Sequence, residues 1–269
     1  MIKNIALFLL GTLILSCKDA PQKTKENNVA AENSAVEEIK DHGFPESFTK
    51  ILDAHGTLAK WKTKQTLSYE MPKPDGKEIH TIDLKSRRDR IDMGTISMGF
   101  DGSKIWLKDD NAAYKGNAAV YHNLMFYFYA MPFVFADPGI NYGETEPLEY
   151  EGKSYPGIHI SFNDGVGASS NDDYFLHYDP ETYQMTWLGY TFTYGSDEKS
   201  DNVKWIRYKD WQNIDGVLLP KSITWHNYEG RSIKEGKDPV QFENVTLETQ
   251  QKPDVFYQKP ESAKVVLNP

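Results

Sequence analysis

The strongest constraint on the fold is a change in hydrophobic period after Trp61. From there to residue 247, apolar and polar residues alternate in one segment after another, and turn sequences such as Asp101-Gly102 separate the segments. A period of two is typical of β-strands that bury one face, and short turns join such strands into hairpins. The chain has no repeating succession of strand, helix and strand, which argues against a parallel, doubly wound sheet.

The alternating segments predict about ten or eleven strands, mostly in consecutive hairpins. They are QTLSYEM (65–71), EIHTIDLKSRRDRIDM (78–93), TISMGF (95–100), KIWLKD (104–109), GIHISF (157–162), TWLGYTFTY (186–194), VKWIRYKDW (203–211), ITWHNY (223–228) and VQFENVTL (240–247). We therefore predict a mainly β (α+β) fold. It consists of a single large, curved antiparallel sheet, or half-open β-barrel, with helices covering its concave face.

The first of two helical zones is FPESFTKILDAHGTLAKW, residues 44–61. Pro45 suits the first turn of a helix, and apolar residues such as Phe48 and Leu52 recur at helical spacing, which gives the helix one apolar face. Gly56 is the residue type that commonly follows the end of a helix, so we expect a break there.

The second helical zone is the aromatic stretch NLMFYFYAMPFVFADPG, residues 123–139. Its apolar run is broken by Pro132 and is shorter than the ~20 residues that a membrane-spanning helix needs. Before the proline, one apolar stripe follows helical spacing. The stripe consists of Tyr121, Leu124, Met125 and Phe128.

Aromatic residues also lie off that stripe, so the helix must be buried on more than one side or face a ligand. The favoured interpretation is a helix packed into the concave face of the sheet, with neighbouring side chains covering its back. The alternative is a lid over an apolar cavity that holds an acyl chain. In that alternative the ligand-binding residues are Tyr121, Leu124, Met125, Phe128, Pro132 and Phe133.

The N-terminus has the features of a bacterial lipoprotein signal peptide. Lys3 precedes the apolar run IALFLLGTLIL (residues 5–15), a charged start and short apolar core of the secretory type. The run ends in ILSC, which resembles a lipobox, the motif that is cut before a cysteine that becomes diacylated. Cys17 is the only cysteine, so it has no partner for an internal disulfide. We predict a signal peptide over residues 1–16 and lipidation of Cys17.

The residues after Cys17 predict a destination and a tether. In the lipoproteins that this one resembles, a residue such as Lys18 after the lipidated cysteine favours the outer membrane, where the protein faces the periplasm or the cell surface. Residues 18–43 are polar and contain no aromatic residue. They cannot bury enough apolar surface to offset the entropy of ordering. We predict a lipidated cysteine and disordered tether over residues 17–43, followed by one β domain over residues 44–269.

The chain is acidic, with 39 Asp and Glu residues, 30 Lys and Arg residues and a formal net charge of −9. This balance argues against a nucleic-acid partner, because phosphates require a basic surface. The one dense basic cluster is KSRRDR, residues 85–90. The favoured interpretation of this cluster is the solvated face of a strand, and a ligand site is the alternative.

No motif predicts catalysis, a metal site or a cofactor. The seven histidines are scattered, and neither the HExxH zinc motif nor the G-x-S-x-G nucleophile motif occurs. His177 and Asp179 would share a strand face, where a solvated polar pair is commoner than a metal site. A hydrolase would need a histidine with a close acidic partner in a cleft, and the sequence places none. We expect a protein that is not an enzyme.

Three strand-and-turn phrases occur in the order FDGSKIW (100–106), HYDPETYQM (177–185) and NIDGVLLPKSI (213–223). They resemble phrases of the lipoprotein-carrier superfamily that includes LolA, LolB and LppX-like proteins. Over about residues 44–250, the order of helix, FDGSKIW, MPFVFADPG and DGVLLP is similar to an uncharacterised family of Gram-negative envelope lipoproteins. The resemblance implies a half-open β-barrel that holds acyl chains under short helices, and it implies no catalytic residue.

These features predict an outer-membrane lipoprotein that binds or carries an apolar or amphiphilic ligand, such as a lipid or an acyl chain, without a covalent bond. The main competing interpretation is a structural or interaction module of the envelope with a filled core. An envelope hydrolase is less favoured. The sequence names no protein partner.

Overall fold

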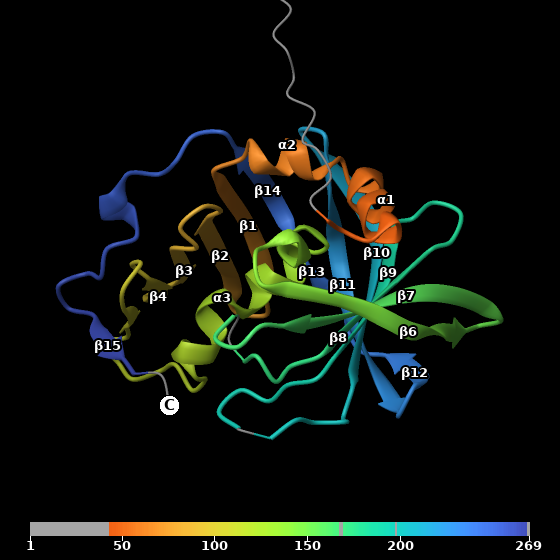
Figure 1. Ribbon diagram of the computed structural model, residues 1–269. Helices are drawn as coiled ribbons and strands as arrows, with labels where there is room; N and C mark the ends of the chain where they lie inside the picture. The colour runs from red at the N-terminus through yellow and green to blue at the C-terminus, as the bar shows by residue number, and fades with distance from the viewer. Residues whose placement is uncertain (1–42, 167–168, 197, 268–269) are drawn as a thin grey trace, which may run out of the picture. The chain divides into compact units, whose positions relative to one another are not determined.

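The computed structural model describes residues 43–166, 169–196 and 198–267. The expected signal peptide, Cys17 and all of the tether except Gly43 lie outside these residues. Among the described residues strands dominate, and every strand pairing is antiparallel. The expected fold class, mainly β and antiparallel with few helices, is confirmed (Figure 1).

The first sheet has the strand order β14-β1-β2-β3-β4-β5-β15. The chain builds β1 to β5 hairpin by hairpin, and two C-terminal strands then pair with the edges. In β1, the alternate residues Leu67, Tyr69 and Met71 are buried, as the period of two requires. The bounds are β1 Thr66–Lys73, β2 Gly76–Asp83, β3 Asp89–Met93, β4 Ile96–Phe100, β5 Ile105–Lys108, β14 Glu243–Glu248 and β15 Lys264–Val266.

The second sheet has the strand order β12-β11-β10-β9-β8-β7-β6, and β13 pairs with β11 beside this path. Each strand lies next to its neighbour in sequence, so this sheet is also a succession of hairpins. The bounds are β6 Ile140–Tyr150, β7 Lys153–Phe162, β8 Tyr174–Tyr178, β9 Met185–Tyr190, β10 Lys204–Ile214, β11 Val217–Glu229, β12 Ser232–Gly236 and β13 Val240–Gln241.

The segment from β13 to β14 joins the two sheets. β13 pairs with β11 of the second sheet, and β14 pairs with β1 of the first. Phe242 lies between them and is buried, with its ring centroid 5.4 Å from that of Tyr69 and 4.1 Å from that of Tyr129. Hydrogen bonding therefore divides the antiparallel surface into two sheets, and the alternating segment 240–247 passes from one to the other.

The helices lie at the ends of the strands and between the sheets. Figure 1 shows α3 in front of the first sheet and beside the strands of the second. It contacts β3, β4 and β5 on one side and β11 on the other. At its start, the Asn117 side chain accepts a hydrogen bond from the N–H of Ala119 at 2.9 Å and caps the helix. The bounds are α1 Glu46–Ala54, α2 Leu58–Lys62, α3 Ala118–Tyr129, and the 3₁₀ helices η1 Phe133–Ala136 and η2 Asp254–Phe256.

The basic cluster KSRRDR differs from its expected structure. Its first four residues form the turn between β2 and β3 rather than the solvated face of a strand. The strand ends because the Asp83 carboxylate accepts hydrogen bonds from the N–H groups of Lys85 and Ser86, both at 2.9 Å. A short acidic side chain commonly stabilises a turn in this way. The favoured interpretation of this cluster was therefore wrong.

Candidate functional site

A cavity of about 820 Å³ lies along α3 and η1. Ligand sites for small molecules commonly measure ~300–1,000 Å³, so its size is in that range. Its wall is formed by α2, the turn between β2 and β3, α3, η1 and residues of β8 and β9. The cavity thus lies where the predicted aromatic helix meets both sheets.

Aromatic rings form much of the cavity wall. Trp61 of α2 stacks on Phe133 of η1, with ring centroids 4.7 Å apart and planes 7° from parallel. Phe128 of α3 lies 4.9 Å from the ring of Tyr190 in β9. Such pairs contribute ~0.5–1.5 kcal/mol beyond the area that they bury. These ring contacts therefore hold the wall in place.

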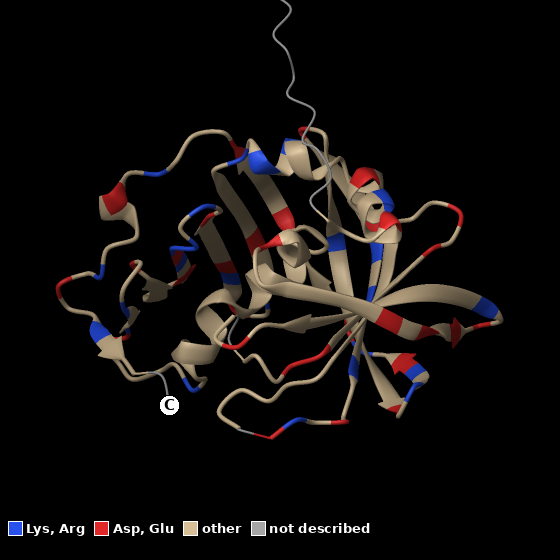
Figure 2. Cartoon of the chain, in the orientation of Figure 1, with Lys and Arg blue, Asp and Glu red and all other residues tan. Residues whose placement is uncertain are grey.

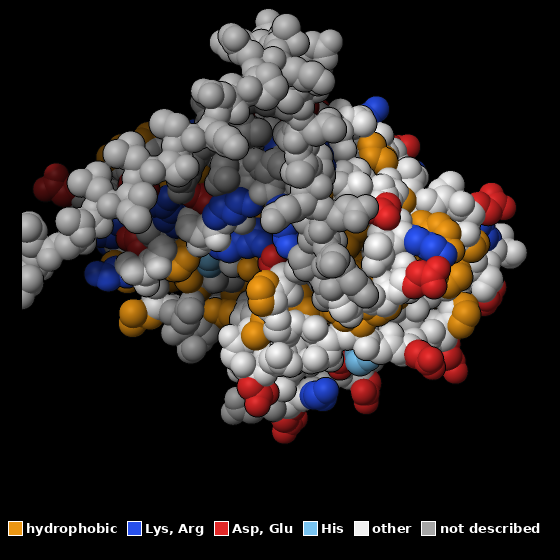
Figure 3. All heavy atoms as spheres, turned by 45° about the horizontal axis from the view of Figure 1, so that its top comes forward, with side chains coloured by type: hydrophobic (Ala, Val, Ile, Leu, Met, Phe, Trp, Pro, Cys, Tyr) orange, Lys and Arg blue, Asp and Glu red, His pale blue; other side chains and the backbone are white. Residues whose placement is uncertain are grey.

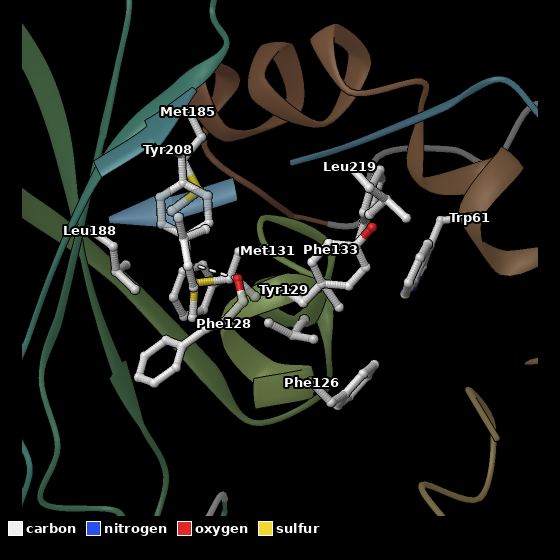
Figure 4. Close-up of a cluster of buried hydrophobic side chains, with 14 of the residues drawn as sticks. Trp61, Phe126, Phe128, Tyr129, Met131, Phe133, Met185, Leu188, Tyr208 and Leu219 are labelled. Atoms are coloured by element: carbon white, nitrogen blue, oxygen red, sulfur yellow. Dashed lines mark hydrogen bonds between the residues drawn. The ribbon is translucent and has the colours of Figure 1, made fainter. Parts of the chain in front are cut away.

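The other side of α3 is packed into the core. Figure 4 shows Phe126 and Phe128 pointing to different sides of the helix. The buried Tyr208 hydroxyl of β10 donates a 2.7 Å hydrogen bond to the carbonyl of Phe128, and it lies 3.7 Å from the sulfur of Met131. Each of the two interpretations of the aromatic stretch thus describes one side of α3. The helix packs into the core on one side and lines a cavity on another.

The six residues expected to contact a ligand divide into two groups. Leu124, Phe128 and Phe133 line the cavity. Tyr121, Met125 and Pro132 do not. The Tyr121 hydroxyl donates a 2.6 Å hydrogen bond to Glu78, Met125 is buried in the core, and Pro132 follows a cis peptide bond. Tyr127 also lines the cavity, although it lies off the apolar stripe. The stripe itself divides between the core, where Met125 lies, and the cavity wall, where Leu124 and Phe128 lie.

Three cationic side chains, those of Lys62, Lys85 and Arg87, line the same cavity. Nη2 of Arg87 donates to Oδ2 of Asp137 at 2.5 Å, and Nζ of Lys85 donates to the carbonyl of Lys62 at 2.6 Å. Lys85 is exposed as a whole, but partial desolvation, together with the nearby charges of Arg87 and Lys62, lowers its pKa. Figure 2 shows basic residues at α2 and at the turn between β2 and β3, and Figure 3 shows basic side chains beside hydrophobic ones. We call these three side chains the basic mouth.

In the turn between β2 and β3, one residue of the basic mouth, Arg87, has an uncommon backbone conformation. Arg87 has φ +60°, in the left-handed region, and its N–H donates a 2.9 Å hydrogen bond to the carbonyl of Asp83. Few residues other than glycine adopt this region. The guanidinium carbon of Arg87 lies 5.2 Å from the ring centroid of Phe126, a cation–π distance. Backbone and ring together fix the position of this side chain.

A histidine paired with a buried acid also meets the cavity. His122 of α3 lines it, and Nδ1 of His122 is 2.6 Å from Oδ2 of Asp89, the first residue of β3. Burial raises the pKa of Asp89 to about 6, although the hydrogen bond with His122 opposes the shift. The expectation that no histidine has a close acidic partner in a cleft was wrong, because the two residues are distant in sequence. The pair joins α3 to the first sheet.

Sequence reasoning missed the basic mouth as part of the site. The density of charge in KSRRDR was the available signal. However, Lys85 and Arg87 reach the aromatic stretch only because the first sheet brings their turn next to η1, and Lys62 comes from a third segment. No local pattern predicts such a meeting of three segments.

Across the described residues, no three His, Cys, Asp or Glu side chains come together closely enough to hold a metal ion. His177 is buried, and Asp179 pairs with Lys153 at 2.5 Å, so these two residues have different surroundings. In the same part of the chain, no helix has both the length and the apolar character to cross a membrane.

The fold and the cavity define an antiparallel β protein with an apolar pocket beside a central helix. The chain belongs to DUF6503, a family of unknown function whose model matches residues 3–227. The expected membership of a family without a known function is thereby confirmed. No curated protein matches the chain.

Solved structures similar to the chain include a LolA superfamily protein from Nitrosomonas europaea. It is 10% identical, with a TM-score of 0.47, and the match covers 78% of this chain and 96% of that one. A DUF1329 family protein from Desulfovibrio piger is also 10% identical, with a TM-score of 0.46 and coverage of 77% and 95%.

Proposed function

We propose that the domain binds the acyl chain of an amphiphile, without a covalent bond, in the cavity beside α3. The observation that carries this proposal is the cavity itself, about 820 Å³ of space bounded largely by aromatic and aliphatic side chains. An acyl chain that enters leaves water, and each buried CH₂ group contributes about 0.8 kcal/mol. The proposed contacts of the acyl chain are Leu124, Phe128 and Phe133.

We also propose that a lipid on Cys17 anchors the protein to the outer membrane, where the domain faces the periplasm or the cell surface. The support is the ILSC motif after a short apolar run, and the presence of a single cysteine. The domain then acts as a binder or carrier in the envelope rather than as an enzyme. In the native host, Cys17→Ala should move the protein from the membrane fraction to the soluble fraction. Unchanged membrane attachment would contradict the anchor.

The cavity proposal is tested with an uncharged, polarity-sensitive fluorophore, N-phenyl-1-naphthylamine. The full chain carrying Cys17→Ala is purified without detergent and titrated with the dye. We expect a rise in fluorescence that long-chain amphiphiles reverse. Leu124 is a half-buried residue of the cavity wall. Leu124→Asp should weaken dye binding by about tenfold or more, because it places a charge where the dye must bind.

The matched control is Val255→Asp. Val255 is 69% exposed and lies outside the cavity wall, so this change introduces the same charge on apolar surface elsewhere. It should leave dye binding unchanged, and circular dichroism checks that both variants fold. If the chain that carries Cys17→Ala alone binds no dye and no lipid co-purifies with it in native mass spectrometry, the proposal fails. The structural or interaction module is then the better interpretation.

A further inference from the structure

In the proposed function, the apolar wall contacts the acyl chain of the ligand. The basic mouth lies in the same cavity wall and is available to contact the headgroup. We propose that the cavity selects a single-chain amphiphile with an anionic headgroup, a carboxylate or a phosphate. Arg87 and the ammonium groups of Lys62 and Lys85 hold the oxygens of the headgroup, and the chain lies among the aromatic rings. This inference rests on the proposed function, because it assigns the headgroup of a ligand whose chain occupies the same cavity.

Of the two terminal nitrogens of the Arg87 guanidinium, one is paired and one is not. Nη2 donates to Asp137, whereas Nη1 is buried and has no hydrogen-bond partner in the described part of the chain. A buried donor without an acceptor is unfavourable, and a charged oxygen is the acceptor that forms the strongest bond with a guanidinium. The planar fork of arginine matches the spacing of carboxylate and phosphate oxygens. Arg87 therefore has one donor that no oxygen of the described residues accepts, and an anionic group would satisfy it.

The charges around the mouth do not cancel. Lys62, Lys85 and Arg87 contribute three positive charges, and Asp137 is the one carboxylate within ion-pair distance of any of them among the described residues. Asp83 is nearby, but its carboxylate is engaged by the backbone of its own turn and by Arg88. The three basic side chains and Asp137 together carry a formal charge of +2 on a chain of net charge −9. The other carboxylate of the cavity wall, Asp172, is engaged by the N–H and hydroxyl of Thr193. An anion reduces the repulsion among these cations.

The backbone supports the same assignment. Arg87 holds a left-handed conformation, φ +60°, in which glycine would be unstrained. Residues held in such sparsely populated regions gather at binding sites, where the surrounding structure fixes them. Here the carboxylate and carbonyl of Asp83 fix the turn. Glycine is the residue that this backbone position favours, but glycine has no side chain. The arginine found here instead places a guanidinium at the cavity wall.

The test compares three ligands that share one chain length: palmitate, hexadecyl phosphate and hexadecanol. Each ligand is titrated into the full chain carrying Cys17→Ala with N-phenyl-1-naphthylamine bound, and the concentration that displaces the dye is measured. We expect at least one of the two anions to displace the dye at a concentration about tenfold or more below that of hexadecanol. Added salt should reduce this preference, because it screens the basic mouth. The stronger of the two anions identifies the headgroup as a carboxylate or a phosphate.

Arg87→Gln should remove most of the preference for the anion, measured as the ratio of the displacing concentrations of hexadecanol and the anion in the same variant. The matched control is Lys77→Gln, which also removes one positive charge but lies at an exposed ion pair with Glu70, outside the cavity wall. It should alter neither ligand. If Arg87→Gln does not fold, the double variant Lys62→Gln, Lys85→Gln replaces it, since both lysines are exposed. A retained preference in the folded variant overturns the headgroup assignment.

The outcomes separate this inference from the proposed function. If all three ligands displace the dye equally well, the cavity binds chains without selecting a headgroup, so the inference fails and the proposed function stands. If none displaces the dye and the dye itself does not bind, the proposed function fails and the inference fails with it. A preference for the anion that Arg87→Gln removes supports both.

Discussion

At the scale of single residues, Gly56 is fixed by its surroundings in two ways. Its φ is +101°, a conformation that L side chains rarely adopt, and an added Cβ would lie 2.0 Å from the carbonyl oxygen of Gly216. We predict that Gly56→Ala lowers the free energy of unfolding by about 2 kcal/mol or more, because the backbone itself must move. Urea denaturation followed by tryptophan fluorescence measures the loss.

Gly152→Ala is the matched control for this prediction. Gly152 also has a positive φ, +76°, but an added Cβ would meet no atom within 4 Å. The control therefore contains the conformational strain without the clash, and it should destabilise the protein clearly less than Gly56→Ala. Equal losses for the two variants would show that the close approach to Gly216 is unimportant.

His55, the residue before Gly56, makes the stability depend on pH. Its Nδ1 lies 2.7 Å from the carbonyl of Ile51, and its Nε2 accepts a hydrogen bond from the N–H of Met185 at 3.4 Å. Only a neutral ring makes both bonds, with its proton on Nδ1. Burial accordingly lowers the pKa of His55 to about 4. The unfolded chain keeps the ordinary value, about 6.5.

Between these two values the unfolded state binds more protons than the folded state. The contribution of His55 to stability is thus complete above pH 6.5 and is lost as the pH falls toward 4. His177 has its pKa lowered to about 4 by burial as well, so it contributes in the same window. We predict that His55→Gln lowers the slope of the free energy of unfolding against pH between 6.5 and 4. The His177 contribution remains, and so does the opposite contribution of Asp89, whose pKa is raised to about 6. Urea denaturation at several pH values tests this, and an unchanged slope contradicts it.

At the scale of elements, a buried hydroxyl of the second sheet bonds to the end of α3. The carbonyl of Phe128 is among the last four of the helix, which have no partner within it. The Tyr208 hydroxyl supplies one. We predict that Tyr208→Phe lowers the free energy of unfolding by about 1–2 kcal/mol, because the carbonyl loses its donor in a buried position. In the control Tyr228→Phe, the lost hydroxyl is exposed and bonds to Asn202, so urea denaturation should detect little change.

The elements that follow a clear period were predictable from the sequence. The segment 65–71 became β1, and the break at Gly56 separates α1 from α2. By contrast, β6 reads INYGETEPLEY and has no regular burial pattern, because its side chains are mostly solvated. The strand expected over 186–194 stops at Tyr190, since the Asp172 carboxylate binds the N–H of Thr193 at 2.7 Å. Pairing at an edge and capping by a distant side chain leave little trace in a local period.

The candidate site was predictable only in part for a related reason. Helical spacing identified the aromatic stretch and placed Leu124 and Phe128 together on one stripe. Which side of that stripe meets the core and which meets open space depends on how closely the two sheets approach it. The basic mouth depends on the same approach, because Lys85 and Arg87 stand on a turn of the first sheet. Both features are properties of the tertiary arrangement rather than of any one segment.

At the scale of the described domain, the two sheets share one core. Side chains of both sheets and of α3 belong to a single buried hydrophobic cluster. Phe242, between β13 and β14, packs against Tyr69 of the first sheet and Tyr129 of α3, and its N–H donates a 2.8 Å hydrogen bond to the carbonyl of Lys221 in the second sheet. Removing its ring should therefore weaken both sheets together.

We predict that Phe242→Ala lowers the free energy of unfolding by about 3–5 kcal/mol, the usual cost of removing a buried phenylalanine ring. Because the core is shared, circular dichroism and tryptophan fluorescence should still follow one transition at a lower urea concentration. Phe192→Ala is the control, since Phe192 is 42% exposed and its loss should change little. Separate transitions in the wild-type chain would show that the two sheets unfold independently, and the cavity between them would then lack the rigid frame that selective binding of a headgroup requires.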